Sequence, residues 1–280
     1  MTKLHHALIL ASSVAASLVL AAAPVRAADC QPKVPDSALT APGKLTMSTN
    51  PTLPPMQFVD STGELKGMRV TLGNEIAKRL CLEPDYVRIE FSAMIPGLQA
   101  GRWDVINTGI FWNAERAGMM KMVPYESQAI SISVPKGNPE KIAKEEDLAG
   151  KSVGVEIGGF EEAKLKELDK KLQSEGLEAI NIRAFDNFAL AYQALSAGQT
   201  DATVSIDPTA AEYAKRGDFD RALSGLFPTP VALAMKNDAV ADAVVGALNE
   251  MMADGSYKKL MDEYGLLANE KPFALRGPND

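Results

Sequence analysis

The chain has 280 residues, of which 46% are hydrophobic and 23% charged, and this composition excludes disordered, collagen-like and low-complexity classes. Lys and Arg number 29 against 36 Asp and Glu, with no run of five basic residues, so we expect no nucleic-acid partner. The length allows one large domain or two smaller ones, and two lobes are the default expectation.

The first 27 residues differ in character from the rest of the chain. Lys3 precedes an apolar stretch at 7–23, and Val25 and Ala27 supply the small side chains that signal peptidase prefers. We therefore predict a cleaved signal peptide at 1–27 and a periplasmic location. An uncleaved membrane anchor stays open as an alternative, although about 17 apolar residues are marginal for a membrane span.

Removal of this segment would also remove His5 and His6, the only histidines of the chain. Without histidine, Ser-His-Asp and Cys-His mechanisms and most zinc, copper and iron sites are excluded. No phosphate-binding or dinucleotide-binding glycine motif is present either. We expect no metal, no cofactor and no catalytic residue.

The only two cysteines, Cys30 and Cys81, would face an oxidising compartment. An even pair in that setting predicts a disulfide, which would close a loop of about 50 residues and contribute about 4 kcal/mol. Two buried free thiols are the alternative.

Hydrophobic periodicity in the first half of the mature chain predicts strands that alternate with helices. After an irregular arm at 29–43, the patterns predict a strand at 44–49, a helix at 72–80 ended by Pro84, a strand at 86–91, a short helix at 95–100 and a buried strand at 103–107. This order is typical of a parallel or mixed sheet covered by helices.

The second half repeats the scheme. The patterns predict a strand at 151–156, a helix at 160–173, a strand at 180–185, a helix capped by Asp186 and ending at Ala197, and a strand at 202–206. Two further helices, at 239–252 and 256–264, would return to the first lobe.

One short motif, L-x-A-G-x-x-D, occurs at 98–104 and again at 195–201. It predicts a helix stopped by a left-handed glycine, a turn, and a carboxylate that opens a buried strand. The recurrence indicates two similar α/β lobes, although a common turn geometry could produce it by chance.

Two extended segments, 130–135 and 230–235, would connect the lobes. We therefore assign 28–128 plus 232–280 to lobe 1 and 129–231 to lobe 2. Two lobes joined by two strands leave a cleft at the carboxyl ends of their sheets, where small ligands bind in open α/β folds.

From residue 44 to 265 the chain resembles the extracellular solute-binding proteins of family 3, the periplasmic receptors of polar-amino-acid uptake transporters. The segments that carry the resemblance are 51–55, 67–80, 98–107, 115–116, 151–158 and 254–257. It implies an α/β, two-lobed periplasmic-binding-protein fold of type II (clam-shell), joined by two crossover strands. It also implies the substrate-binding component of an ABC uptake transporter, a monomer that binds a small carboxylate-bearing solute and meets a membrane permease.

In this family an arginine at the position of Arg116 binds the α-carboxylate of the ligand, and a guanidinium suits that task because it forms bidentate hydrogen bonds. A surface pairing of Arg116 with Glu115 is the alternative. Thr108 and Gly109 match residues that offer a hydroxyl and backbone groups to the same carboxylate. Gly159 lies in a turn that opens a helix, where free N–H groups bind anionic oxygen.

Several departures from the family pattern predict an unusually apolar pocket. Leu53 stands where a stacking aromatic is common, and Met56 where phenylalanine is usual. Phe111 and Phe160 replace residues with hydroxyl groups. Together with Phe91, they would present an apolar wall to a cyclic, N-substituted or hydrophobic acid.

The site for the α-ammonium group is less defined. The acidic residue that family members use is replaced by Ile206, and Asp207 follows one position later. Asp207 would reach a ligand only if its strand bulges, and would otherwise point away. Glu161 is the second candidate, with a role at the helix N-terminus as its alternative.

A few relatives of this family are periplasmic dehydratases of cyclohexadienyl or arogenate type. They use a carboxyl group in the cleft as general acid, a role that Glu156 or Glu161 could fill. We expect a binding protein rather than an enzyme, with the dehydratase as the alternative.

Overall fold

The computed structural model describes residues 30–280, so the predicted signal peptide at 1–27 lies outside the described residues. Both cysteines are disulfide-bonded, and the predicted Cys30–Cys81 bridge is confirmed. Within the described range, none of the helices combines the length and the apolar character needed to cross a membrane.

The first lobe is built from strands and helices in alternation. Its elements are η1 (Asp36–Ala38), β1 (Lys44–Thr49), α1 (Met68–Arg79), β5 (Glu83–Arg88), η2 (Phe91–Ala93), α2 (Met94–Gln99), β6 (Val105–Phe111) and α3 (Ala114–Met119). The short strands β2 (Thr52–Leu53), β3 (Gln57–Val59) and β4 (Leu65–Lys66) form a separate three-stranded sheet. β1 pairs in parallel with β5 on one side and with β6 on the other.

The second lobe repeats this arrangement. Its elements are η3 (Glu145–Leu148), β8 (Ser152–Glu156), α4 (Phe160–Ser174), β9 (Asn181–Phe185), α5 (Phe188–Ser196), β10 (Ala202–Ile206) and α6 (Asp207–Lys215). β8 pairs in parallel with β9 and with β10, as β1 does with β5 and β6. The strand orders β5-β1-β6 and β9-β8-β10 therefore match element by element.

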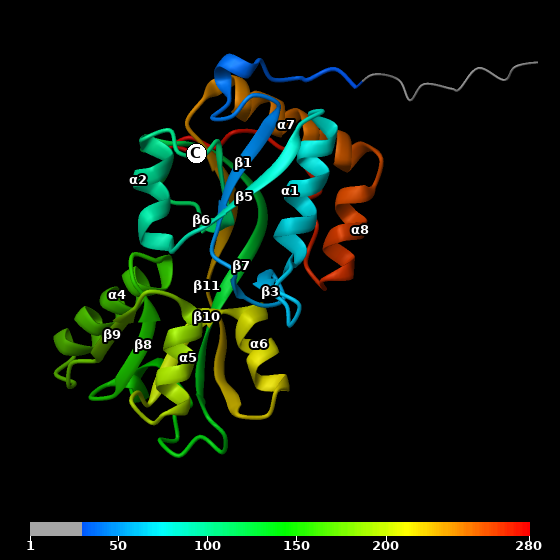
Figure 1. The fold of residues 1–280 in the computed structure, drawn as a ribbon. Coiled ribbons are helices and arrows are strands. Elements are labelled where there is room, and N and C mark those ends of the chain that lie inside the picture. Colours follow the sequence, from blue (N-terminus) through cyan, green and yellow to red (C-terminus); the bar gives the residue numbers. More distant parts are fainter. Residues whose placement is uncertain (1–29) are drawn as a thin grey trace, which may run out of the picture. The chain divides into compact units, whose positions relative to one another are not determined.

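Two long strands, β7 (Lys121–Pro135) and β11 (Phe219–Met235), run through both lobes and pair with each other in antiparallel fashion (Figure 1). β11 pairs with β6 of the first lobe, whereas β7 pairs with β10 of the second. The result is a single eight-stranded sheet in the order β5-β1-β6-β11-β7-β10-β8-β9. This confirms the two-lobed α/β fold with two crossovers, while the exact lobe boundaries stay a prediction.

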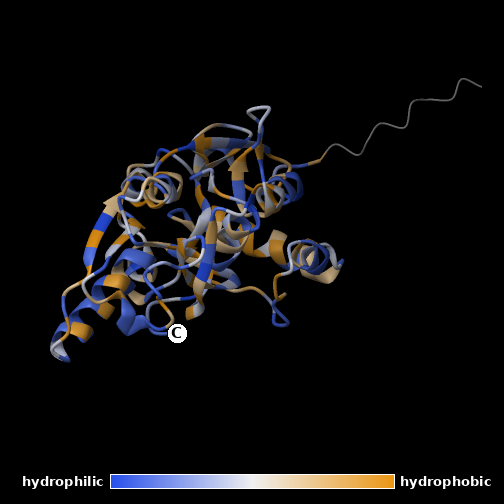
Figure 2. Ribbon diagram, turned by 90° about the horizontal axis from the view of Figure 1, so that it is seen from below, coloured by the Kyte–Doolittle hydropathy of each residue, from blue (hydrophilic) through white to orange (hydrophobic). Residues whose placement is uncertain are grey.

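The last two helices, α7 (Asp238–Ala253) and α8 (Ser256–Glu263), pack on the first lobe, where α7 contacts α1. The helices carry both hydrophobic and hydrophilic residues, which appear as orange and blue along the ribbon in Figure 2. In α7, for example, Val240, Val244 and Leu248 are fully buried, and their spacing puts them on one face. Burial of such faces against the sheet stabilises each lobe.

The repeated sequence motif has the same structure in both lobes. Gly101 and Gly198 end their helices in the left-handed conformation, with φ of 68° and 67°. Asp104 then accepts hydrogen bonds from Thr46 N at 2.9 Å and from the Thr40 backbone and hydroxyl at 2.7 and 2.8 Å. Asp201 accepts bonds from the backbone and hydroxyl of Ser152 at 2.7 and 2.8 Å. Each carboxylate thus ties β6 or β10 to the start of the central strand of its lobe.

Several details of the predicted elements differ from the structure; β6, for example, begins at Val105 and not at Trp103. Helix α5 is capped by Asn187, whose side chain accepts a bond from Leu190 N, and not by Asp186. β5 begins at Glu83, so Pro84 lies inside a strand, which is tolerated because β5 is at the edge of the sheet. The crossover strands extend well beyond 130–135 and 230–235.

Candidate ligand-binding cleft

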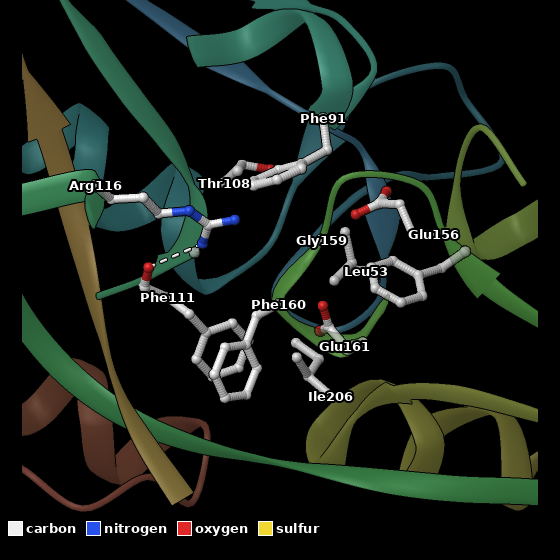
Figure 3. A pocket seen from close by; sticks show the side chains of 12 residues that line it. Leu53, Phe91, Thr108, Phe111, Arg116, Glu156, Gly159, Phe160, Glu161 and Ile206 are labelled. Atoms are coloured by element: carbon white, nitrogen blue, oxygen red, sulfur yellow. Dashed lines mark hydrogen bonds between the residues drawn. The ribbon is translucent and has the colours of Figure 1, made fainter. Parts of the chain in front are cut away.

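A small cavity lies between the two lobes, at the carboxyl ends of β6, β8 and β10. The empty space at the cavity, including the part that is open to solvent, is about 310 Å³, and its interior has room for about one water molecule. The lining residues are Leu53, Phe91, Thr108, Gly109, Phe111, Arg116, Glu156, Gly159, Phe160, Glu161, Phe188 and Ile206. Figure 3 shows their side chains converging from both lobes.

On the first lobe, an irregularity in β6 brings polar groups to the cavity. Between Ile106 and Ile110, β6 has more residues than the facing part of β11, so the register shifts. The intervening segment contains Gly109, with φ of 82°. Thr108 Oγ1 accepts bonds from Asn50 N at 3.0 Å and Gln57 Nε2 at 3.1 Å. Since both acceptor positions of this hydroxyl are used, its proton is directed elsewhere and can be donated to a ligand.

A buried ion pair lies directly beneath Gly109. Arg69, 1% exposed, donates to Glu126 Oε1 from Nη2 at 2.8 Å and to Thr108 O from Nη1 at 3.0 Å. A Cβ atom at Gly109 would lie 2.0 Å from Arg69 Cζ. Only glycine fits at this position, because any side chain would displace the guanidinium.

Arg116, on the short helix α3, is the cation of the first lobe that lines the cavity. Its Nη1 donates to Phe111 O at 2.9 Å and its Nη2 to Gly158 O, on the second lobe, at 3.4 Å. The guanidinium carbon lies 5.3 Å from the centre of the Phe91 ring. Burial lowers the pKa of Arg116, and the charges of Glu161 and Glu115 oppose that shift. A guanidinium stays charged at any physiological pH, so the cleft contains a buried cation with donors to spare.

On the second lobe, carboxylates dominate the turn between β8 and α4. Glu156 is the last residue of β8, and Glu161 and Glu162 lie in the first turn of α4. Glu162 Oε2 accepts a bond from Gly158 N at 2.7 Å. Because these side chains already compensate the N-terminus of α4, that helix end is a poor site for an anionic ligand group.

The two carboxyl groups that line the cavity have strongly shifted pKa values. Burial, with contributions from the charges of Glu161 and Glu90, raises the pKa of Glu156 well above its usual range, although Asn50 donates to Glu156 Oε1 at 2.6 Å. Burial also raises the pKa of Glu161 to about 7, against the opposing charges of Arg116 and Arg69. Both groups therefore hold protons more readily than exposed glutamates do.

Aromatic side chains close the cavity from both lobes. Phe111 at the end of β6 and Phe160 at the start of α4 stack with their ring centroids 4.3 Å apart. Phe91 and Phe188 contribute two further rings to the lining. The walls thus combine aromatic and aliphatic surface with the charged groups of Arg116, Glu156 and Glu161. The predicted fit to an apolar acid stays a prediction.

Two further hydrogen bonds join the lobes around the cavity. One is the bond from Asn50 Nδ2 to Glu156 Oε1, and the other runs from Asn187 Nδ2 to Glu90 Oε1 at 3.0 Å. With the Phe111–Phe160 stack and the Arg116–Gly158 bond, they hold the lobes together at the cleft. Separation of the lobes would break all four contacts and open the cavity.

The model for bacterial extracellular solute-binding proteins of family 3 matches residues 45–266 of this chain. The chain belongs to this family. The match covers both lobes and both crossover strands, so the resemblance predicted from the sequence is confirmed.

Relatives agree with this assignment over most of their length. The chain is 28% identical over 227 residues to the L-cystine-binding protein TcyJ of Escherichia coli (strain K12), which covers 79% of the chain and 82% of the relative. It is 26% identical over 258 residues to the arginine-binding protein ArgT of Corynebacterium glutamicum, which covers 88% and 84%.

Solved structures show the same fold. An ancestral arginine-binding protein bound to arginine superposes with a TM-score of 0.74 at 32% identity, covering 79% of this chain and 98% of that one. An ancestral amino-acid-binding protein, a precursor of cyclohexadienyl dehydratase, gives 0.70 at 29% identity, covering 79% and 95%. The family role, binding of a substrate for an ABC transporter, therefore extends to this chain.

The structure brings most of the predicted ligand-binding residues to one cavity. Those that line it are Leu53, Phe91, Thr108, Gly109, Phe111, Arg116, Gly159, Phe160 and Glu161. Their contact with a ligand stays a prediction.

Met56 and Asp207 lie away from this cavity. Met56 is fully buried in the core of the first lobe. Asp207 begins α6, where its carboxylate accepts bonds from the Ser131 hydroxyl at 2.5 Å and from Gly225 N at 3.1 Å. β10 pairs with β7 without a register shift up to Ile206, so no bulge turns Asp207 toward the cleft.

Three lining residues were not predicted as ligand-binding, namely Glu156, Phe188 and Ile206. Glu156 and Ile206 end strands β8 and β10, and Phe188 opens α5. A glutamate as the last residue of a buried strand was the available sequence signal for Glu156, since the strand's carboxyl end borders the cleft.

Proposed function

We propose that this chain is the periplasmic receptor for an amino acid or a closely related carboxylate, which it binds between its lobes and delivers to the permease of an ABC transporter. In this proposal it acts as a monomer and carries out no reaction. The relatives named above bind L-cystine or arginine, which supports a ligand of this class.

The observation that carries the proposal is the position of Arg116. Its guanidinium is buried in an interlobe cavity, and it already donates to a carbonyl oxygen of each lobe. A ligand carboxylate at the same guanidinium would gain charge-assisted hydrogen bonds in an environment with little water, where such bonds are strong. The Thr108 hydroxyl would supply a further donor from the same lobe.

Ligand entry requires the lobes to separate first, because the present cavity is too small for an amino acid. A ligand that contacts both lobes stabilises the closed form, and the closed form is what a permease can distinguish from the open one.

A thermal-shift screen of the mature chain against amino acids and related acids tests the proposal. A ligand at 100 times its dissociation constant should add about 2.7 kcal/mol of stability. Arg116→Ala should lower the affinity for that ligand by more than about a hundredfold, since it removes the partner of a buried carboxylate. Arg102→Ala, an exposed arginine of the same lobe, is the matched control and should bind normally. No stabilisation by any carboxylate would contradict the proposal.

A dehydratase is the second candidate. Glu161, with a pKa of about 7 in a water-poor cavity, meets the requirement for a general acid near neutral pH. Incubation with prephenate or arogenate, followed by absorbance of an aromatic product, distinguishes this candidate. Product formation that is lost in Glu161→Gln would establish the enzyme, and absence of product at high protein concentration would exclude it.

A further inference from the structure

The cleft contains two buried carboxylates that cannot bind the carboxylate of a ligand, because they would carry the same charge. Glu156 and Glu161 are 4% and 3% exposed, and both line the cavity. They flank one point: a Cβ atom at Gly159 would lie 2.9 Å from Glu161 Oε2 and 3.9 Å from Glu156 Oε2. In Figure 3 both carboxyl groups face the space between the lobes.

Neither carboxylate has a cationic partner. In the range 30–280, no lysine or arginine nitrogen lies within 4.0 Å of either of them. Glu156 is bonded only to the neutral amide of Asn50, and Glu161 accepts from no residue other than its own backbone N–H. A carboxylate buried in this way is costly, and proteins retain one where a ligand or another group compensates it.

The charges that face the pair come from several elements. Arg116 on α3 and Arg69 on α1 act on Glu161 from the first lobe. Glu90, which follows β5, adds a third negative charge near Glu156, and Glu115 accompanies Arg116. Arg69 is already paired with Glu126. If Arg116 is neutralised by the ligand carboxylate, no uncommitted cation faces Glu156 and Glu161.

We propose that Glu156 and Glu161 form a cation subsite, and that the preferred ligand is an amino acid whose side chain carries a second positive charge. The inference rests on the proposed function, because it assigns the carboxylate of the same ligand to Arg116. The side-chain cation would then lie at the two carboxylates and compensate their charge. The phenyl rings of the lining suit this choice, since the face of an aromatic ring attracts a cation.

Protonation of the pair gives the subsite a dependence on pH. Without a ligand, Glu161 has a pKa of about 7, so it is partly protonated at neutral pH. A cation beside it favours the charged form and lowers that pKa. Binding therefore releases a proton, and the affinity for a cationic ligand should rise between pH 5.5 and pH 8.

Calorimetric titration with L-arginine and L-citrulline tests the subsite on the mature chain. The two probes share the carboxylate and the α-ammonium group, but the ureido group of citrulline is uncharged. We expect arginine to bind at least about tenfold more tightly at pH 8, with a factor of ten equal to about 1.4 kcal/mol. Repetition in two buffers of different ionisation enthalpy should reveal proton release with arginine and none with citrulline.

Three variants locate the effect. Glu161→Gln and Glu156→Gln should each lower the affinity for arginine by about tenfold or more, and each should change the affinity for citrulline by less than twofold. Glu167→Gln, an exposed glutamate on the same helix, is the matched control and should change neither. If a variant fails to fold, the comparison of the two probes on the unmodified chain still decides.

The outcomes separate this inference from the proposed function. Equal binding of citrulline and arginine, lost in Arg116→Ala, would overturn the cation subsite and leave the amino-acid receptor intact. Binding of neither probe nor any other carboxylate would overturn both. Tighter binding of arginine in Glu161→Gln would also overturn the subsite.

Discussion

The first lobe reaches the cleft through β6, which ends in a bulge with Thr108 and Gly109 and leads to the cation of Arg116. The second lobe reaches it through β8 and the first turn of α4, which supply the carboxyl groups of Glu156 and Glu161. The strand order and the aspartate that ties each lobe together are the same. The chain thus repeats its scaffold but not its site. The scaffold determines where side chains converge, and the individual residues determine which charges they bring.

The asymmetry has a physical reason. Two lobes with like charges at the cleft would repel each other on closure, whereas opposite charges favour closure and also match the two ends of a zwitterion. A ligand in the cleft separates the opposite charges of the two lobes. Because it binds to both of them, it holds the lobes together in their place.

The largest expected effect comes from two left-handed glycines, one in each lobe. Gly109→Ala should cost about 4 kcal/mol of unfolding free energy, because it adds backbone strain and displaces the buried Arg69. Gly158→Ala, with φ of 75° and only an ordinary 3.8 Å contact to Ser92, should cost about 1 kcal/mol. Urea unfolding of both variants measures the difference. Equal losses of stability would show that the Arg69 guanidinium can be displaced at little cost in free energy.

The carboxyl group of Glu161 should make the ligand-free protein less stable as the pH rises. Its pKa is raised from the ordinary 4.5 to about 7 in the folded state, so the folded chain binds more protons in this window. The stability is full below about pH 4.5 and falls until about pH 7. Glu161→Gln should therefore be more stable than the unmodified chain at pH 8, by at most about 3 kcal/mol, and equally stable at pH 4. Denaturant titrations at both pH values measure this, and a variant less stable at pH 8 would contradict it.

The two aspartates of the repeated motif provide a matched pair. Asp104 accepts three hydrogen bonds and Asp201 accepts two from Ser152. Asp104→Ala should cost about 3 kcal/mol and Asp201→Ala about 2 kcal/mol, since bonds to charged acceptors are strong. Chemical denaturation ranks the two variants. A reversed order would indicate that the hydrogen bonds of Asp201 stabilise the second lobe more than those of Asp104 stabilise the first.

The smallest effect on binding should come from Asp207. Its carboxylate is bonded to Ser131 and Gly225, outside the cavity. Asp207→Asn should change the affinity for any ligand by less than twofold, while the protein loses about 1 kcal/mol of stability. A tenfold loss of affinity, seen by titration, would mean that Asp207 turns into the cleft when ligand binds.

The fold was predictable because hydrophobic periodicity and turn glycines act locally. β1 at Lys44–Thr49 and β10 at Ala202–Ile206 have the predicted bounds. The crossover strands were only half predicted, because Glu126 and Gln128 interrupt the apolar pattern of β7. These polar groups are buried all the same, since Arg69 pairs with Glu126, which in turn accepts from Gln128. Such compensation between distant residues is invisible in local periodicity.

The site was predictable on the first lobe more than on the second. Arg116 and Thr108 stand at positions that the family resemblance marks, and both line the cavity. On the second lobe Glu161, the second candidate for the ammonium group, lines the cavity, whereas Asp207 does not. Glu156, which the resemblance offered only as a possible general acid, joins it from the end of β8. Which lobe element faces the cleft depends on how α4 meets β8, and the sequence pattern does not specify that angle.

The measurement that tests the division of charge most directly is a titration of three ligands against three proteins. The ligands are L-arginine, agmatine, which lacks the carboxylate, and L-citrulline, which lacks the side-chain cation. The proteins are the unmodified chain, Arg116→Ala and Glu161→Gln. We predict that Arg116→Ala weakens arginine and citrulline but hardly changes agmatine, while Glu161→Gln weakens arginine and agmatine but hardly changes citrulline. If both variants weaken all three ligands by the same factor, the two lobes do not recognise opposite ends of the ligand, and the account is wrong.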